Sequence, residues 1–148
     1  MFCFIVSVAR VTPRAADDLF TMELSARASA QEQTAHGQAV SPTSNRSPRA
    51  VLATKSGTKI RIRWSIVNQE KTGIIPDVTV HLLLDHDQKD AVYESALVMD
   101  FAAQARSSAD FVVAALAPGN YVLRLETIGA ARSHGHEHAA VMDVKVRP

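Results

Sequence analysis

The sequence predicts an all-β fold, an antiparallel β-sandwich of about seven strands. Segments in which apolar and polar residues alternate recur from residue 51 onward. This period of two is typical of strands with one buried and one solvated face. Turn-forming residues separate these segments at intervals of roughly 8–15 residues, and no helical pattern longer than about ten residues competes with them.

Residues 1–50 are predicted to be a disordered tail in front of a single domain over residues 51–148. Residues 17–27 fit one short helix capped by an aspartate, but its apolar stripe is thin. Residues 28–50 are rich in Ala, Ser, Gln, Thr, Pro and Asn, so few side chains there can anchor in a core. Burial would not offset the entropy lost on ordering such a segment.

The chain starts with a short apolar run, residues 1–9, which Arg10 ends. A secretory signal also needs a basic start, which is missing here, so this run is either a remnant export signal or an apolar tip. It is far shorter than the ~20 residues of a membrane span. Cys3 is the single cysteine, so an intramolecular disulfide is impossible. We expect a secreted or periplasmic protein with no transmembrane segment.

About seven segments after the tail carry the strand pattern. They are residues 51–54, 58–67, 78–84, 91–101, 109–116, 121–128 and 139–146. The second segment alternates most cleanly. Its apolar face holds Ile60, Ile62, Trp64 and Ile66, and its polar face holds Lys59, Arg61, Arg63 and Ser65. Such alternation favours an antiparallel sheet, because parallel strands are usually buried on both faces.

The basic stripe of Lys59, Arg61 and Arg63 is interpreted as a solvated sheet face. No aromatic residue interleaves with it, as a strand that binds single-stranded nucleic acid would require. The formal net charge of +1 supplies no field that attracts a polyanion. Nucleic acid is therefore not expected as a partner.

The last two strands are predicted to form a β-hairpin after the turn at Pro118-Gly119. If Tyr121 lies opposite Val146, the inward sets of both strands match in one register. The pairs are then 121 with 146, 123 with 144, 125 with 142 and 127 with 140. Tyr121, just after the turn, resembles the tyrosine corner of immunoglobulin-like sandwiches, in which the hydroxyl bonds back to nearby backbone.

The inward Trp64 and the Tyr121 corner make the domain resemble immunoglobulin-like and fibronectin-type modules, without the cysteine pair of antibody domains. Residues 94–101, 118–127 and 136–138 also resemble a family of exported bacterial immunoglobulin-like domain proteins of unknown activity. The resemblance covers residues 51–148. It implies a fold and a compartment, and no activity.

Three of the six histidines, His134, His136 and His138, lie in the loop of the predicted hairpin, with Glu137 between the last two. Imidazole is the commonest protein ligand of zinc and copper, and Glu137 could add an oxygen. A structural zinc site needs four ligands, so this loop would have to curl around the ion. The alternatives are a solvated loop, a pH-responsive loop, and a His138 that caps the core on the inward face.

A second polar cluster comprises Asp85, His86, Asp87 and Asp90. Its carboxylates could hold calcium, but their spacing does not fit the calcium-binding loop of an EF-hand. The cluster is expected at the opposite end of the sandwich from the histidine loop. The sequence contains no nucleophile elbow, phosphate loop or zinc-protease motif. We therefore expect a non-catalytic binding or scaffolding module that acts through its loops, with an unknown protein as one conceivable partner.

Two other functions compete with this expectation. The first is a periplasmic copper or zinc protein that uses the histidine loop, in outline similar to the small sandwich copper carriers but without their N-terminal histidine and Met-rich runs. The second is an accessory domain that docks on a larger complex through a sheet edge.

Overall fold

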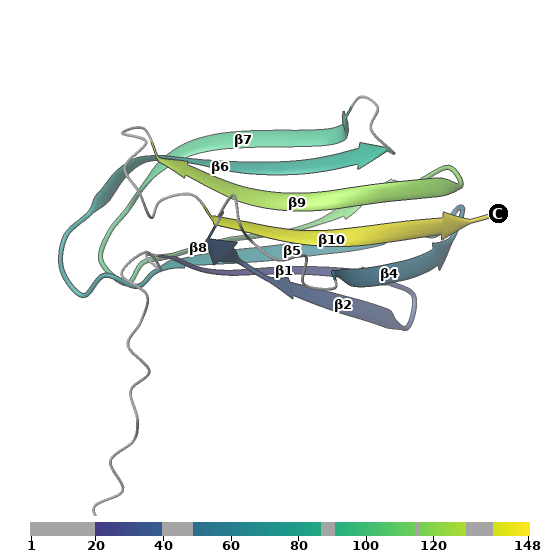
Figure 1. Cartoon of the computed structure of the whole chain (residues 1–148), viewed down its shortest axis with the longest axis horizontal. Helices are drawn as coiled ribbons and strands as arrows, with labels where there is room; N and C mark the ends of the chain where they lie inside the picture. Colours follow the sequence, from purple (N-terminus) through teal and green to yellow (C-terminus); the bar gives the residue numbers. More distant parts are fainter. Residues whose placement is uncertain (1–19, 40–48, 87–90, 115, 130–137) are drawn as a thin grey trace, which may run out of the picture.

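Two β-sheets pack face to face in the computed structural model, which describes residues 20–39, 49–86, 91–114, 116–129 and 138–148 (Figure 1). These residues form ten strands. They are β1 (Phe20–Ala28), β2 (Gln31–His36), β3 (Gln38–Ala39), β4 (Ala50–Lys55), β5 (Ile60–Asn68), β6 (Ile75–His86), β7 (Ala91–Phe101), β8 (Arg106–Val113), β9 (Gly119–Gly129) and β10 (His138–Arg147). The described residues contain no helix long and apolar enough to cross a membrane.

The smaller sheet, sheet A, has the strand order β2-β1-β5-β8, and the larger, sheet B, has the order β3-β10-β9-β6-β7. The order β10-β9-β6-β7 corresponds to strands G-F-C-C′ of immunoglobulin domains, and β1-β5-β8 corresponds to A-B-E. The predicted all-β sandwich is therefore confirmed, and its strand order is compatible with an immunoglobulin-like arrangement. One pairing departs from the expected antiparallel pattern, because β4 runs parallel to β10 over Met142–Arg147.

The core lies between the sheets and is built by alternating residues, as the sequence predicts. All four predicted apolar residues of β5 are buried, Trp64 at 7% exposure and the others at 2% or less. Facing them from sheet B are the buried side chains of Val78, Val80, Leu82, Leu84, Leu123, Leu125, Ala140, Met142 and Val144. All seven strands predicted after residue 50 are present, as β4 to β10.

The prediction of a disordered tail over residues 1–50 is wrong for residues 20–39, which form β1, β2 and β3. The short helix predicted within residues 17–27 is also wrong where the structure describes that segment, because β1 is an antiparallel partner of β5 over its whole length. Phe20, Met22 and Leu24 alternate with polar residues and are 4% exposed or less. The folded unit therefore begins before residue 51.

The polar composition of residues 28–50 wrongly predicts disorder for β2, because β2 is the outer strand of sheet A. In this strand Ala35 alone is buried, while Gln31, Glu32 and Thr34 are exposed. An edge strand needs few apolar side chains because backbone hydrogen bonds to its neighbour hold it in the sheet. A lack of apolar residues therefore does not by itself indicate disorder.

The hairpin of β9 and β10 has the predicted faces inward, but its register differs by two residues from the prediction. Leu123 lies opposite Met142, and Thr127 lies opposite His138. A shift of two keeps every side chain on its face, so the hydrophobic pattern cannot distinguish the two registers. In the observed register, the His138 backbone N–H donates to Thr127 Oγ1 at 3.2 Å, in the buried interior.

The tyrosine corner is present, because the Tyr121 hydroxyl donates to the Ala117 carbonyl at 2.7 Å. Replacing Tyr121 with Phe is expected to destabilise the protein by about 1 kcal/mol, since a partly buried carbonyl loses its donor. Urea denaturation measures this change. Tyr93→Phe is the control, because the Tyr93 hydroxyl makes no hydrogen bond with the described residues, and equal losses for both variants would contradict the expectation.

Candidate functional site on the outer face of sheet A

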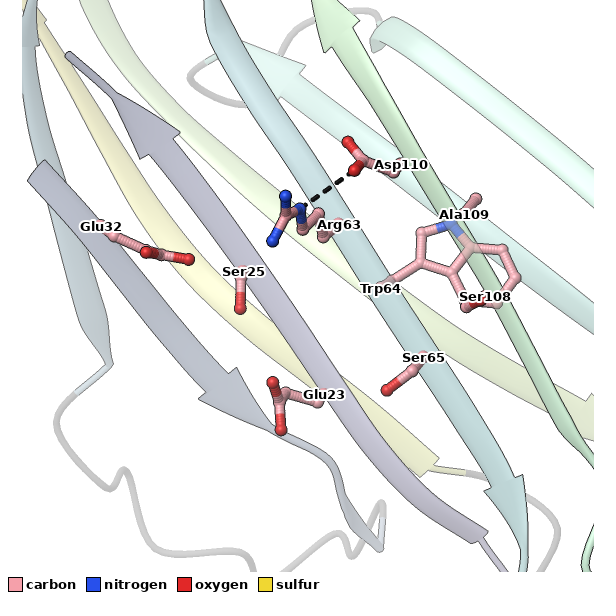
Figure 2. A pocket seen from close by; sticks show the side chains of 9 residues that line it. All are labelled: Glu23, Ser25, Glu32, Arg63, Trp64, Ser65, Ser108, Ala109 and Asp110. Atoms are coloured by element: carbon pink, nitrogen blue, oxygen red, sulfur yellow. Dashed lines mark hydrogen bonds and ion pairs between the residues drawn. The ribbon is translucent and has the colours of Figure 1, made fainter. Parts of the chain in front are cut away.

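The outer face of sheet A contains an open hollow with a volume of about 430 Å³ (Figure 2). The residues that line it are Glu23, Ser25, Glu32, Arg63, Trp64, Ser65, Ser108, Ala109 and Asp110. They come from all four strands of the sheet, and therefore from three separate parts of the chain. The folded sheet, rather than any local sequence motif, assembles the site.

Strand register explains why a hollow forms here. Two neighbouring rows of outward side chains cross the sheet: Thr34, Ser25, Arg63 and Asp110 in one, and His36, Glu23, Ser65 and Ser108 in the next. The serines at the centre of these rows are much shorter than the Arg and Glu side chains beside them, which leaves space above the sheet. Trp64 and Ala109 pair on the inner face and lie beneath that space.

An ion-pair cluster forms one wall of the hollow. Arg61 donates through Nε and Nη2 to the two carboxylate oxygens of Asp110, both at 2.7 Å. Arg63 Nε donates to Asp110 Oδ2 at 3.0 Å, the contact drawn in Figure 2. A bidentate Arg–carboxylate pair fixes the orientation of both groups. The cluster therefore holds Asp110 and Arg63 in defined positions, although all three side chains are about half exposed.

The hydrogen bonds from Arg61 hold the pKa of the Asp110 carboxyl below its usual value, and the same bonds raise the pKa of Arg61. A lowered folded-state pKa means that the cluster contributes stability above the ordinary carboxyl pKa of about 3.9. That contribution is lost as the pH falls through the lowered value. At neutral pH the carboxylate is ionised and is a weak proton acceptor.

Titration of the Asp110 carboxyl by NMR is expected to give a pKa below about 3.9. Arg61→Gln should raise that pKa toward the ordinary value, since it removes both charge and hydrogen bonds. Arg27→Gln is the matched control, because Arg27 lies directly opposite Arg61 on β1 and its side chain donates to the Ser29 carbonyl. The substitution removes the same charge but no hydrogen bond to Asp110. An unchanged pKa in Arg61→Gln would refute the role assigned to the cluster.

The chemical character of the hollow is polar and mixed. Three serine hydroxyls donate and accept, the Arg63 guanidinium donates, and the carboxylates of Glu23, Glu32 and Asp110 accept. No large apolar side chain is exposed among the lining residues. Such a surface can form many hydrogen bonds to a polar ligand but offers little apolar contact area.

The histidine loop predicted to bind metal falls mostly outside the described residues, which exclude His134, His136 and Glu137. His138 is described, and it lies on the inner face of β10 with 1% exposure, as its parity in the strand predicts. Its ring and the Phe20 ring pack in a T-shaped arrangement with centroids 6.0 Å apart. A metal site that includes His138 would have to draw this imidazole out of the core. Copper or zinc binding by the loop remains a prediction.

The second polar cluster is also only partly described, because Asp87 and Asp90 lie outside the described residues. His86 stacks against Tyr121 with ring centroids 4.6 Å apart. His86 pairs with the first part of β9, whereas the histidine loop follows Gly129 at its other end. The described members His86 and His138 therefore lie toward opposite ends of β9, in sheet B. The described residues contain no group of three or more His, Cys, Asp or Glu placed to hold a metal ion.

Sequence reasoning missed most of the hollow. The sequence pattern places Arg61 and Arg63 on a solvated stripe, and it does not mark Glu23, Ser25 or Asp110 as site residues. One feature of the sequence could have indicated the ion pairs. Asp110 has the outward parity of a predicted strand, so its carboxylate could pair with an arginine of a neighbouring strand. The pattern does not show which strands are neighbours, so the pairing of β5 with β8 could not be read from it.

No protein-family model matches this sequence, and no curated protein matches it. Solved structures that are similar to it in fold include the following two. The crystal structure of the C-terminal domain of wzt aligns over 84% of this chain and 71% of its own, with a TM-score of 0.49 and 9% identity. Chicken MD-1 complexed with lipid IVa aligns over 81% and 96%, with a TM-score of 0.36 and 9% identity. Likenesses at this level carry no argument about function.

Proposed function

We propose that this chain is a non-catalytic binding module and that its ligand binds on the outer face of sheet A. The observation that carries the proposal is the hollow of about 430 Å³ lined by three serines, three carboxylates and Arg63. Its volume lies within the range of small-molecule sites, roughly 300–1,000 Å³. Binding is favoured over catalysis because Asp110 is held ionised by two arginines and is thus poorly suited to accept or donate a proton.

The chemistry of the hollow favours a neutral ligand with many hydroxyl groups, such as an oligosaccharide. Neighbouring hydroxyls donate to carboxylates and accept from a guanidinium, and the hollow offers both kinds of partner side by side. An anionic ligand would meet Glu23 and Glu32 while Arg63 is already paired with Asp110. A purely apolar ligand would leave these polar groups without hydrogen bonds, at a cost of about 1–3 kcal/mol each.

Two further expectations from the sequence stand as proposals beside this one. Ligand contacts through the loops that contain residues 87–90 and 130–137 are a separate proposal, and these residues lie outside the described ones. Location outside the cytoplasm would expose the module to polysaccharides and other polyhydroxylated ligands. Neither proposal is needed for the sheet-face site, which rests on described residues alone.

Calorimetric titration of the full chain with three classes of soluble probe tests the proposed function. The probes are neutral oligosaccharides, the same oligosaccharides carrying sulfate or phosphate groups, and spermine as a polycation. At least one neutral oligosaccharide is expected to bind with a Kd on the order of 1 mM or tighter. Its anionic derivative is expected to bind more weakly. Binding confined to the anionic probes or to spermine would overturn the proposed ligand class.

A further inference from the structure

Strand β7 forms the outer boundary of sheet B and has one free edge. It pairs with β6 over nearly its whole length, and no described strand pairs with its other edge. A free edge presents a row of unpaired backbone N–H and C=O groups, to which another extended chain can add. With 11 residues, β7 is longer than the mean strand of about 5–6 residues.

The free edge of β7 lacks most of the features that usually prevent such pairing. Natural edge strands are protected by lysines, prolines, bulges or short length. The strand reads Ala-Val-Tyr-Glu-Ser-Ala-Leu-Val-Met-Asp-Phe and contains no lysine, arginine or proline. The irregularities in its pairing with β6 lie near its two ends, so the stretch from Tyr93 to Met99 is regular. The charged residues of β7 are the two carboxylates of Glu94 and Asp100.

Large apolar side chains are exposed along β7. Val92 is 49% exposed, Leu97 50% and Val98 69%. Val92 and Val98 have the parity of the outer face, and Leu97 has the parity of the inner face. Exposed apolar residues concentrated on an unprotected edge are a feature of interaction surfaces.

The side-chain pattern of β7 matches itself in one antiparallel register. With a two-fold axis at Ser95, Tyr93 of one copy faces Leu97 of the other, and Val92 faces Val98. Glu94 then faces Ala96, and Asp100 lies beyond the paired stretch. Each exposed apolar residue thus gains an apolar partner, and no two acidic residues are directly opposed.

The neighbouring registers are less favourable. An axis at Leu97 would place Glu94 opposite Asp100, and like charges directly opposite destabilise a sheet. An axis at Ala96 would place Val92 opposite Asp100 and Val98 opposite Glu94, so two apolar side chains would face carboxylates. The charge and apolar pattern therefore selects the register centred on Ser95.

We propose that this chain forms a two-fold symmetric dimer in which β7 pairs antiparallel with β7 of a second copy, centred on Ser95. Sheet B then continues from one copy into the other, and the free edge of each copy is paired. The proposal does not rest on the proposed function. The hollow belongs to sheet A, so both copies would keep their hollows exposed, and one dimer would present two sites to a repeating ligand.

Sedimentation equilibrium of the full chain measures the first consequence. The wild-type chain is expected to give twice its monomer mass of 16.0 kDa at micromolar concentrations. Val98→Glu places a carboxylate diagonally next to Glu94 of the other copy and is expected to give the monomer mass. Val112→Glu is the matched control on the outer strand of sheet A, where Val112 is 57% exposed, and it is expected to remain a dimer.

Disulfide trapping in a Cys3→Ser background tests the register. Directly opposite residues have Cβ atoms about 4.5–5.5 Å apart, so Ser95→Cys is expected to cross-link with its own copy under mild oxidation. Leu97→Cys lies two residues from the axis, which puts the two Leu97→Cys positions about 13 Å apart, beyond disulfide reach. A monomeric wild-type chain, a dimeric Val98→Glu variant, or cross-linking of Leu97→Cys that matches Ser95→Cys would each overturn the proposal.

Discussion

A fragment of residues 51–148 is expected to be unfolded. This fragment lacks β1, which covers one edge of β5 and buries Phe20, Met22 and Leu24 in the core. Losing a buried Phe costs about 3–5 kcal/mol and losing a buried Leu or Met about 2–5 kcal/mol each. The sum, at least about 7 kcal/mol, is comparable to the entire stability of a domain, about 5–15 kcal/mol.

Circular dichroism and amide NMR of two fragments check this expectation. Residues 20–148 retain every described strand and are expected to melt cooperatively with dispersed amide signals. Residues 51–148 are expected to show collapsed amide dispersion and no cooperative transition. A cooperative melt of the 51–148 fragment would show that β1 is dispensable, as the sequence alone suggested.

Filling the hollow is expected to abolish ligand binding without loss of stability. Ser65 lies near the centre of the hollow, beside Glu23 on one strand and Ser108 on the other. Ser65→Tyr places a ring where the ligand would bind, and we expect at least a tenfold loss of affinity, or about 1.4 kcal/mol. Because the side chain points to solvent, the free energy of unfolding should change by less than about 0.5 kcal/mol.

Thr79→Tyr is the matched control for this substitution. Thr79 is a half-buried residue on the outer face of sheet B. The Thr79→Tyr substitution therefore adds a similar ring on the opposite side of the molecule. The oligosaccharide that binds the wild-type chain best is the probe for both variants. Equal affinity of Ser65→Tyr and wild type would remove the hollow as the binding site.

Local periodicity was sufficient to predict the strands after residue 50, because β5, β6, β9 and β10 each bury one face in the core. The same alternation is present in Phe20, Met22 and Leu24. However, Asp17 and Asp18 favour a helix cap just before this segment, and the polar residues 28–50 just after it favour a disordered tail. The error arose because the composition of β2 reflects its position at an edge, which is a property of the whole sheet.

The candidate site depends on long-range pairing and was therefore harder to predict. Arg61 and Asp110 are 49 residues apart in the sequence, and only the pairing of β5 with β8 brings them to 2.7 Å. The register of the β9–β10 hairpin shows the same limit. Thr127 lies opposite His138, whereas the prediction places it opposite Ala140, and both registers bury the same side chains. Faces can be predicted from a pattern of period two, whereas neighbours and registers cannot.

Mapping of backbone amide shifts in the full chain during titration with the best-binding neutral oligosaccharide tests the proposed site most directly. If the hollow is the binding site, the largest shifts are expected on the outer face of sheet A, at Glu23, Ser25, Ser65, Ser108 and Asp110. Residues on the outer face of sheet B, such as Thr79 and Val141, are expected to shift little. Shifts that concentrate on sheet B or in the loops, with the sheet A residues unchanged, would contradict the proposed site.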